Sequence, residues 1–248
     1  MKLTILGSGT CVPSLKRNAS GYLLEAEGKE VLIDCGSGIL LQLERAGKSY
    51  KDIDALFITH GHPDHIADLM PLIHALFYTP NFTRETDLII FAPQGFRQYY
   101  DKAIGSILGE SADFQIVFMD VAAKMEFDPW SIFTASTIHS ADSIAYRFEY
   151  GGRSVVFSGD ADYDQGIIGL SEKADLLIAD CSFPDAMKVK GHLSAKECGL
   201  LAQNAGVKKL VLSHIYPADT PDEDRITEAK DHFKGDVILA EDLMEIEV

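Results

Sequence analysis

The first half of the chain alternates short apolar runs with longer stretches of helical period. The runs are rich in β-branched and aromatic residues and end at glycine or polar turn residues, which is typical of strands. The stretches between them place apolar residues three and four positions apart, which indicates helices. The predicted strands are 2–6, 20–26, 30–34, 55–59, 88–92 and 114–119, and the predicted helices are 39–46, 68–78 and 96–107.

The second half is dominated by strand-type runs. Gly151 and Gly152 separate two of them and predict a tight hairpin. The predicted strands are 130–136, 145–150, 154–158, 176–180 and 209–213, followed by two short strands at the C-terminal end.

Two helices of the second half have recognisable ends. Ser194 and Glu197 have the spacing of a capping box, and Gly206 ends the helix that they begin. Thr220 is predicted to cap a further helix that has Pro221 at its first position.

Strands with helices set between them, in two halves, indicate an α/β or α+β fold. We find no linker, low-complexity segment or short repeat, and we predict one domain over residues 1–248. The predicted helix 68–78 is apolar nearly all round, which suggests burial in the core or contact with a partner. His74 on this helix is interpreted as a packed core or interface residue.

Composition narrows the class of protein. The net charge is −16, whereas proteins that bind long nucleic acids usually carry a basic surface. The acidity therefore favours a small substrate, although bound divalent ions would make a pocket locally positive. No apolar run approaches the roughly 20 residues that span a bilayer. Residues 2–6 are too short for a secretory apolar segment.

The four cysteines lack a Cys-x-x-Cys spacing and are predicted to be free thiols in a reducing cytoplasm. Cys35 and Cys181 fall on loops that could border a site, and we interpret both as small buried apolar residues.

The strongest chemical signal follows the predicted strand 55–59. Three histidines and one aspartate occupy six positions there, in a chain with only 8 histidines in 248 residues. Neutral imidazole and carboxylate are ligands of zinc and similar divalent ions. We expect two of these side chains to converge on one point and two on another, the residues being His60, His62, Asp64 and His65.

Three more candidate ligands lie in the second half, each just beyond a strand-type run. They are His139, Asp160 and His214. Because loops converge where buried strands emerge, we expect these side chains to complete a site for two metal ions.

The pattern His60-x-His62-x-Asp64-His65 resembles the metallo-β-lactamase fold of dinuclear metallohydrolases. The resemblance extends from Gly7 to His214 and implies a four-layer αββα sandwich of two mixed sheets with helices outside. It assigns His60, His62 and His139 to one metal, and Asp64, His65 and His214 to the other. It makes Asp160 the bridging carboxylate. Oxygen-reducing di-iron relatives resemble His-x-Glu-x-Asp, so His62 favours hydrolysis over redox chemistry.

Within that fold the chain is similar to the ribonuclease Z and phosphodiesterase branch. The opening from Leu6 to Asn18 and the turn Asp34-Cys35-Gly36 match that branch, which implies that Asp34 orients the metal loop. Gly191-His192-Leu193-Ser194 resembles the loop whose histidine protonates the leaving group. His192 is therefore the candidate general acid.

Two departures from ribonuclease Z concern the substrate. The arm that clamps transfer RNA is inserted between the equivalents of His139 and Asp160, and here 160 − 139 = 21 residues leave room only for a hairpin. Asp180-Cys181-Ser182 replaces a Glu-Ala-Thr stretch near the acid histidine, with Asp180 as a shorter supporting carboxylate. Both departures favour the armless phosphodiesterases of the branch.

The resulting hypothesis is a phosphodiesterase for a small or cyclic substrate, in which a hydroxide bridges two zinc ions and Asp64 orients it. Manganese or iron are the alternative metals. Single basic residues on loops are weaker candidates for phosphate contacts: Arg17, Lys188 and Lys190.

Three other functions stay open from the sequence. They are a ribonuclease Z-like endoribonuclease acting on RNA ends, a thioester, lactone or sulfate-ester hydrolase of the same fold, and a non-catalytic metal-binding protein. The branch commonly forms homodimers, and the apolar segment 69–77 would suit such an interface. Its alternative is burial within one chain.

Overall fold

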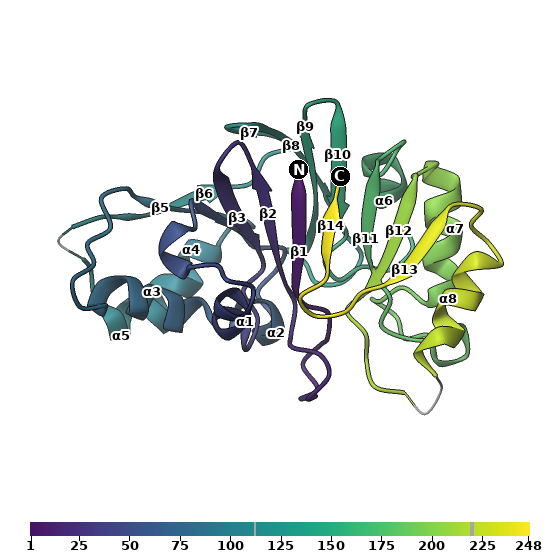
Figure 1. The fold of residues 1–248 in the computed structure, drawn as a ribbon, viewed down its shortest axis with the longest axis horizontal. Coiled ribbons are helices and arrows are strands. Elements are labelled where there is room, and N and C mark those ends of the chain that lie inside the picture. The colour runs from purple at the N-terminus through teal and green to yellow at the C-terminus, as the bar shows by residue number, and fades with distance from the viewer. Residues whose placement is uncertain (112, 219–220) are drawn as a thin grey trace.

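The computed structural model describes residues 1–111, 113–218 and 221–248 and consists of two seven-stranded mixed sheets with helices on their outer faces (Figure 1). The first sheet has the order β14-β1-β2-β3-β4-β5-β6. Its strands are β1 Lys2–Gly7, β2 Gly21–Ala26, β3 Lys29–Ile33, β4 Ala55–Phe57, β5 Leu88–Ala92, β6 Ile116–Asp120 and β14 Glu245–Glu247.

The second sheet has the order β13-β12-β11-β10-β9-β8-β7. Each sheet combines antiparallel strands with a run of parallel strands, which are β3 to β6 in the first and β10 to β13 in the second. The strands of the second sheet are β7 Lys124–Phe127, β8 Trp130–Ser136, β9 Ile144–Tyr150, β10 Arg153–Phe157, β11 Leu176–Asp180, β12 Lys209–Ser213 and β13 Asp236–Leu239.

The core is divided into three apolar layers. One fills the space between the sheets, with Phe57, Trp130 and Phe148 among its largest members. The other two lie between each sheet and its own helices. The predicted four-layer sandwich is confirmed.

Helices α1 to α5 cover the first sheet, and α6 to α8 cover the second (Figure 1). A π-helical turn at Asp101–Gly105 joins α4 to α5, so the predicted helix 96–107 is one continuous but irregular segment. The helices are α1 Ile39–Arg45, α2 Pro63–Ile66, α3 Leu69–Tyr78, α4 Phe96–Tyr100, α5 Ser106–Leu108, α6 Gln165–Leu170, α7 Ala195–Ala205 and α8 Asp222–Lys230.

Local predictions agree with the structure where turn or cap chemistry is specific. The capping box of α7 is present, and Gly206 follows its end with φ 65°. Pro221 lies one position before α8, so the prediction of proline at the first helical position was wrong by one residue. The cap predicted at Thr220 lies outside the described residues. Strand β7 and the short helices α2 and α6 were not predicted.

Helix α3 buries one face against the first sheet. Leu69, Leu72 and Leu76 are buried against the first sheet. His74 is exposed in the single chain and lies beside Tyr78, so it is not a core histidine, and its interpretation as an interface residue stays a prediction. Across the described ranges, the structure has no helix that is long and apolar enough to cross a membrane.

The parallel strands bring the candidate functional side chains to the same edges of the two sheets. The carboxyl ends of parallel neighbours meet at one edge of a sheet, and polar residues follow several of these ends here. Asp34 follows β3, His60 follows β4, Asp160 follows β10 and His214 follows β12. Asp180 is the last residue of β11.

Candidate metal centre

The first donor group lies where β4 leaves its sheet. His60 Nε2 and His139 Nε2 lie 2.9 and 3.0 Å from His62 Nδ1. The same two Nε2 atoms lie 3.7 and 3.5 Å from Asp160 Oδ2. Each residue contributes one ligand-type atom, and these atoms all lie within 4.8 Å of one another.

The second donor group lies on the other side of Asp160. Helix α2 starts with Pro63 and carries Asp64 and His65 on its single turn. Asp64 Oδ2 lies 3.9 Å from His65 Nε2 and 3.4 Å from His214 Nε2. Asp160 Oδ1 lies 3.1 and 3.3 Å from the same two nitrogens. The two oxygens of Asp160 therefore face different groups.

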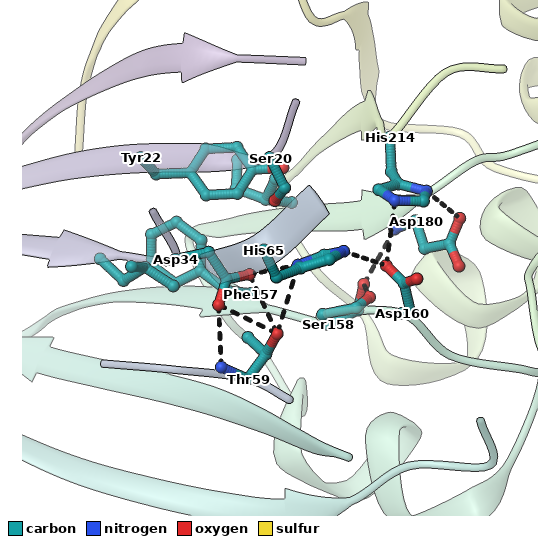
Figure 2. A pocket seen from close by; sticks show the side chains of 13 residues that line it. Ser20, Tyr22, Asp34, Thr59, His65, Phe157, Ser158, Asp160, Asp180 and His214 are labelled. Atoms are coloured by element: carbon teal, nitrogen blue, oxygen red, sulfur yellow. Dashed lines mark hydrogen bonds and ion pairs between the residues drawn. The ribbon is translucent and has the colours of Figure 1, made fainter. Parts of the chain in front are cut away.

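Three buried polar atoms of this centre lack a hydrogen-bond partner among the described residues. They are His65 Nε2, Asp160 Oδ1 and His214 Nε2. An unpaired buried polar atom costs about 1–3 kcal/mol, and these three point at one another (Figure 2). Imidazole nitrogens and carboxylate oxygens gathered in this way fit divalent metal ions.

In four of these histidines, the ring nitrogen Nδ1 faces away from the donor groups and contacts another part of the protein. Asp34 Oδ2 lies 2.7 Å from His65 Nδ1, and the carbonyl oxygen of Gly191 accepts from His139 Nδ1 at 2.9 Å. Thr59 Oγ1 lies 3.0 Å from His60 Nδ1, and Ser182 Oγ lies 3.1 Å from His214 Nδ1. Such contacts fix the orientation of a ring and aim its second nitrogen at the metal. Asp34 thus contacts His65, a residue of the segment that it is predicted to orient.

Backbone strain accompanies this arrangement. Asp34 has φ 59° and His214 has φ 55°, which is the left-handed region that non-glycine residues seldom adopt. Each such residue costs of the order of 1–3 kcal/mol and persists where its surroundings hold it. At Asp34 those surroundings include the backbone and hydroxyl of Thr59.

The charges of the centre favour a cation. Burial and then the charge of His65 lower the pKa of His60 to about 2. Burial also lowers the pKa of His214, but the charge of Asp160 and further contacts outweigh it and raise the pKa to about 10. Although burial opposes it, His214 and His65 hold the pKa of Asp160 well below its usual value. Asp160 thus stays ionised and attracts positive charge.

His192 lies beside the second donor group. Its Nδ1 is 2.9 Å from Asp180 Oδ2 and 3.9 Å from Asp160 Oδ2, and its ring is stacked on His214 with centroids 5.6 Å apart. Burial lowers the pKa of His192, but the hydrogen bond to Asp180 and the charges of Asp180 and Asp160 together outweigh it, and the pKa is raised. Asp180 also contacts the ring of His214, with Oδ1 3.6 Å from Nδ1.

The predicted phosphate contacts have different surroundings. Arg17 is buried and donates to Ser8 Oγ, to the carbonyl of Ala240 and to Asp222. These bonds engage its guanidinium inside the protein and do not support a phosphate contact.

Lys188 also has partners within the protein. It donates to Asp162 Oδ1 at 2.5 Å, to the carbonyl of His192 at 2.6 Å and to Glu197. It therefore anchors the loop that carries His192. Lys190 on the same loop is exposed.

Sequence reasoning missed the hydroxyl and backbone groups that hold the candidate ligands. Thr59 and Ser182 directly adjoin predicted functional segments, and this adjacency was the available signal. Gly191 directly precedes His192, but its contribution is a backbone carbonyl, which any residue type offers. Cys35 and Cys181 are fully buried, as interpreted from the sequence.

Residues 29–215 match the family model described as the Beta-lactamase superfamily domain. The chain belongs to this superfamily. The probable metallo-hydrolase YhfI of Bacillus subtilis is 31% identical, and the match covers 97% of each chain. Ribonuclease Z of Methanosarcina acetivorans is 29% identical, with 100% of this chain and 98% of the relative covered.

Solved structures agree with this membership. The crystal structure of YhfI from Bacillus subtilis has a TM-score of 0.87 at 29% identity, covering 100% of this chain and 99% of the other. Human tRNase Z, short form, has a TM-score of 0.81 at 24% identity with the same coverage, which supports the shared fold alone. The chain is a hydrolase of the metallo-β-lactamase fold.

Proposed function

We propose that this hydrolase uses two zinc ions to cleave a small or cyclic phosphodiester. The observation that carries the proposal is the position of Asp160, which turns one oxygen towards each of two donor groups. One group would hold the first ion and the other the second. The proposed ligands are His60, His62 and His139 for the first, Asp64, His65 and His214 for the second, and Asp160 for both.

Bound divalent ions would supply Lewis acidity, which lowers the pKa of water and neutralises charge on a phosphate group. Asp64 would hold the attacking water in position for attack on phosphorus. His192 would give the proton on Nε2 to the leaving oxygen, because its Nδ1 faces Asp180 at 2.9 Å. Asp180 would keep this ring in place through its contact with the His192 side chain, and Lys188 through its hydrogen bond to the His192 carbonyl.

The size of the substrate is inferred from the chain between His139 and Asp160. These residues are joined by the β9–β10 hairpin, whose turn is Gly151-Gly152. The alignment with ribonuclease Z of Methanosarcina acetivorans has 305 positions, so 305 − 248 = 57 of them have no residue in this chain. The alignment with YhfI has 244 positions. A shorter chain and a net charge of −16 support a small substrate over transfer RNA.

The first test combines metal content with activity. Protein purified without chelator should contain close to two zinc ions per chain and hydrolyse bis(p-nitrophenyl) phosphate. Asp64→Ala should abolish this hydrolysis. Fewer than about one metal ion per chain, or full activity in Asp64→Ala, would contradict the proposal.

The second test concerns His192. His192→Ala should lower kcat by roughly 10²–10⁴-fold for aryl phosphodiesters with poor leaving groups. It should have little effect with 4-nitrophenolate, which leaves without a proton. An equal loss for every leaving group would exclude His192 as the general acid.

A second candidate is an endoribonuclease, which is favoured by the several relatives named ribonuclease Z. Cleavage of a precursor transfer RNA with higher kcat/KM than small phosphodiesters would select it. The opposite preference would select the phosphodiesterase.

A further inference from the structure

Two open hollows border the metal centre, one beside each donor group. The first, of about 390 Å³, is lined by His62 and is called here the His62 hollow. Its other walls include Gln94, Phe96, Tyr99 and Asp142. The second, of about 310 Å³, is lined by Asp64 and by the loop between β1 and β2, and is called the Asp64 hollow. A phosphodiester has two ester groups, and the centre offers a space next to each of its donor groups.

The His62 hollow has an aromatic wall. Phe96 and Tyr99 lie on α4, directly after β5, with ring centroids 5.6 Å apart. Phe96 is buried and supports Tyr99, which is 46% exposed. An exposed ring that rests on a buried ring offers a flat surface on which another ring can stack.

The same hollow lacks cationic groups. No lysine or arginine is among the described residues that line it, whereas Asp142 contributes a carboxylate. Arg97, next to Phe96 in the chain, is paired with Asp101 at 2.8 Å. In the Asp64 hollow the lining cation is Arg17, which is bonded within the protein. A substrate with further phosphates would therefore find no counter-charge in the described walls of either hollow.

Resting on the proposed function, we infer that the His62 hollow binds a planar, uncharged aromatic substituent of a phosphodiester that carries a single negative charge. Tyr99 stacks on this ring, which is either a nucleobase or an aryl group. The exposed amide of Gln94 lies at the same hollow and can bond to the edge of a nucleobase. Tyr99 is thus a residue that determines specificity.

Three substrates with the same leaving group test this inference. Methyl p-nitrophenyl phosphate, bis(p-nitrophenyl) phosphate and thymidine 5′-(p-nitrophenyl phosphate) differ only in the ester that is retained. Tyr99→Ala should lower kcat/KM roughly tenfold for an aromatic retained ester, because stacking of this kind stabilises the complex. The methyl ester should change less than about twofold, since its retained methyl group cannot stack. A larger loss for the thymidine ester would identify a nucleobase, and a larger loss for the bis-aryl ester an aryl group.

The controls separate stacking from a change in folding. Tyr99→Phe keeps the ring and should retain the preference for aromatic esters. Tyr78→Ala removes a tyrosine that is 62% exposed on α3, outside the lining of both hollows, and should leave all three substrates unchanged. An equal loss on all three substrates in Tyr99→Ala, or no loss on either aromatic ester, overturns the inference.

A binding measurement tests whether the His62 hollow binds an aromatic group, independently of whether the protein is a phosphodiesterase. Calorimetry of the zinc-loaded protein should show tighter binding of phenylphosphonate than of methylphosphonate, and Tyr99→Ala should remove the difference. Equal affinities in the unsubstituted protein overturn the inference. Absence of turnover on all three diesters would overturn the phosphodiesterase function. The calorimetry alone would then decide whether the His62 hollow binds an aromatic group.

Discussion

At the scale of single residues, the centre depends on which nitrogen of each histidine the protein engages. Ser182 illustrates this, because its one proton is directed at Asp180 Oδ1 at 2.6 Å. Its oxygen can then only accept, which assigns the proton of His214 to Nδ1 at 3.1 Å. Loss of the second ring proton on metal binding would then leave the lone pair on Nε2, which faces the donor group and is the form that a metal ligand needs.

Ser182→Ala should therefore weaken metal binding. Loss of a residue that orients a ligand typically costs 10–100-fold in metal affinity or activity, and we expect a fall of about this size in zinc affinity. Competition with a chromophoric chelator measures it. Ser131→Ala is the control, since its hydroxyl bonds to Glu126 on an exposed edge of the second sheet. Unchanged zinc affinity in Ser182→Ala would exclude the orienting role.

At the scale of elements, helices and strands with specific local signals were predicted correctly, and short elements without such signals were missed. The α7 helix was predictable because Ser194, Glu197 and Gly206 each act on the nearest turn. Strand β7 was missed because it is a short edge strand that alternates between exposed and half-buried residues. Helix α2 has a single turn, which is too short to show a helical period.

Contacts between elements also decide how the N-terminal loop is held. Asp222 on α8 accepts from Lys16 at 2.7 Å, from Arg17 at 3.2 Å and from Arg225 at 3.1 Å. Arg17 and Arg225 are both buried. Asp222 therefore joins the loop after β1 to a helix that lies more than 200 positions later in the sequence.

This contact predicts a pH dependence of stability. Although burial raises it, hydrogen bonds with Lys16 and Arg17 hold the pKa of Asp222 below its usual value. A lowered folded pKa means that the contribution is complete above the unfolded pKa of about 4 and is lost as the pH falls through the folded value. Asp222→Asn should lower the free energy of unfolding by about 1 kcal/mol at pH 7, and by less as the pH falls below 4.

Urea unfolding of both proteins between pH 3 and pH 7 measures this difference. Glu223→Gln is the matched control, because Glu223 is exposed on the same helix. A difference between wild type and Asp222→Asn that stays constant over this range would contradict the prediction.

At the scale of the whole molecule, the proposed ligands come from both sheets. His60, His62, Asp64 and His65 follow a strand of the first sheet, whereas Asp160 and His214 follow strands of the second. Metal ions at this centre would therefore connect the two halves of the sandwich. Binding to the folded state alone stabilises that state by mass action.

Zinc should therefore raise the melting temperature of the chelator-treated protein. At a hundredfold excess over Kd, one site contributes about 2.7 kcal/mol, which corresponds to a rise of roughly 5–10 °C for a chain of this length. Scanning calorimetry with zinc measures the rise, and magnesium at equal ionic strength is the control because it prefers oxygen ligands. In Asp160→Ala most of the rise should disappear. A full rise in Asp160→Ala would mean that zinc binds elsewhere.

The sequence by itself determined the types of candidate ligand, their order and the strands that precede them, because a strand end and a side chain that can bind a metal are local features. It also predicted the hairpin at Gly151-Gly152. Only the tertiary structure decided that Arg17 bonds inward and that Ser182 directs His214. It alone placed Tyr99 in the same hollow as His62. The contacts of Arg17 and Ser182 join residues 9 to 223 positions apart, and local pattern carries no information on which distant groups a folded backbone brings together.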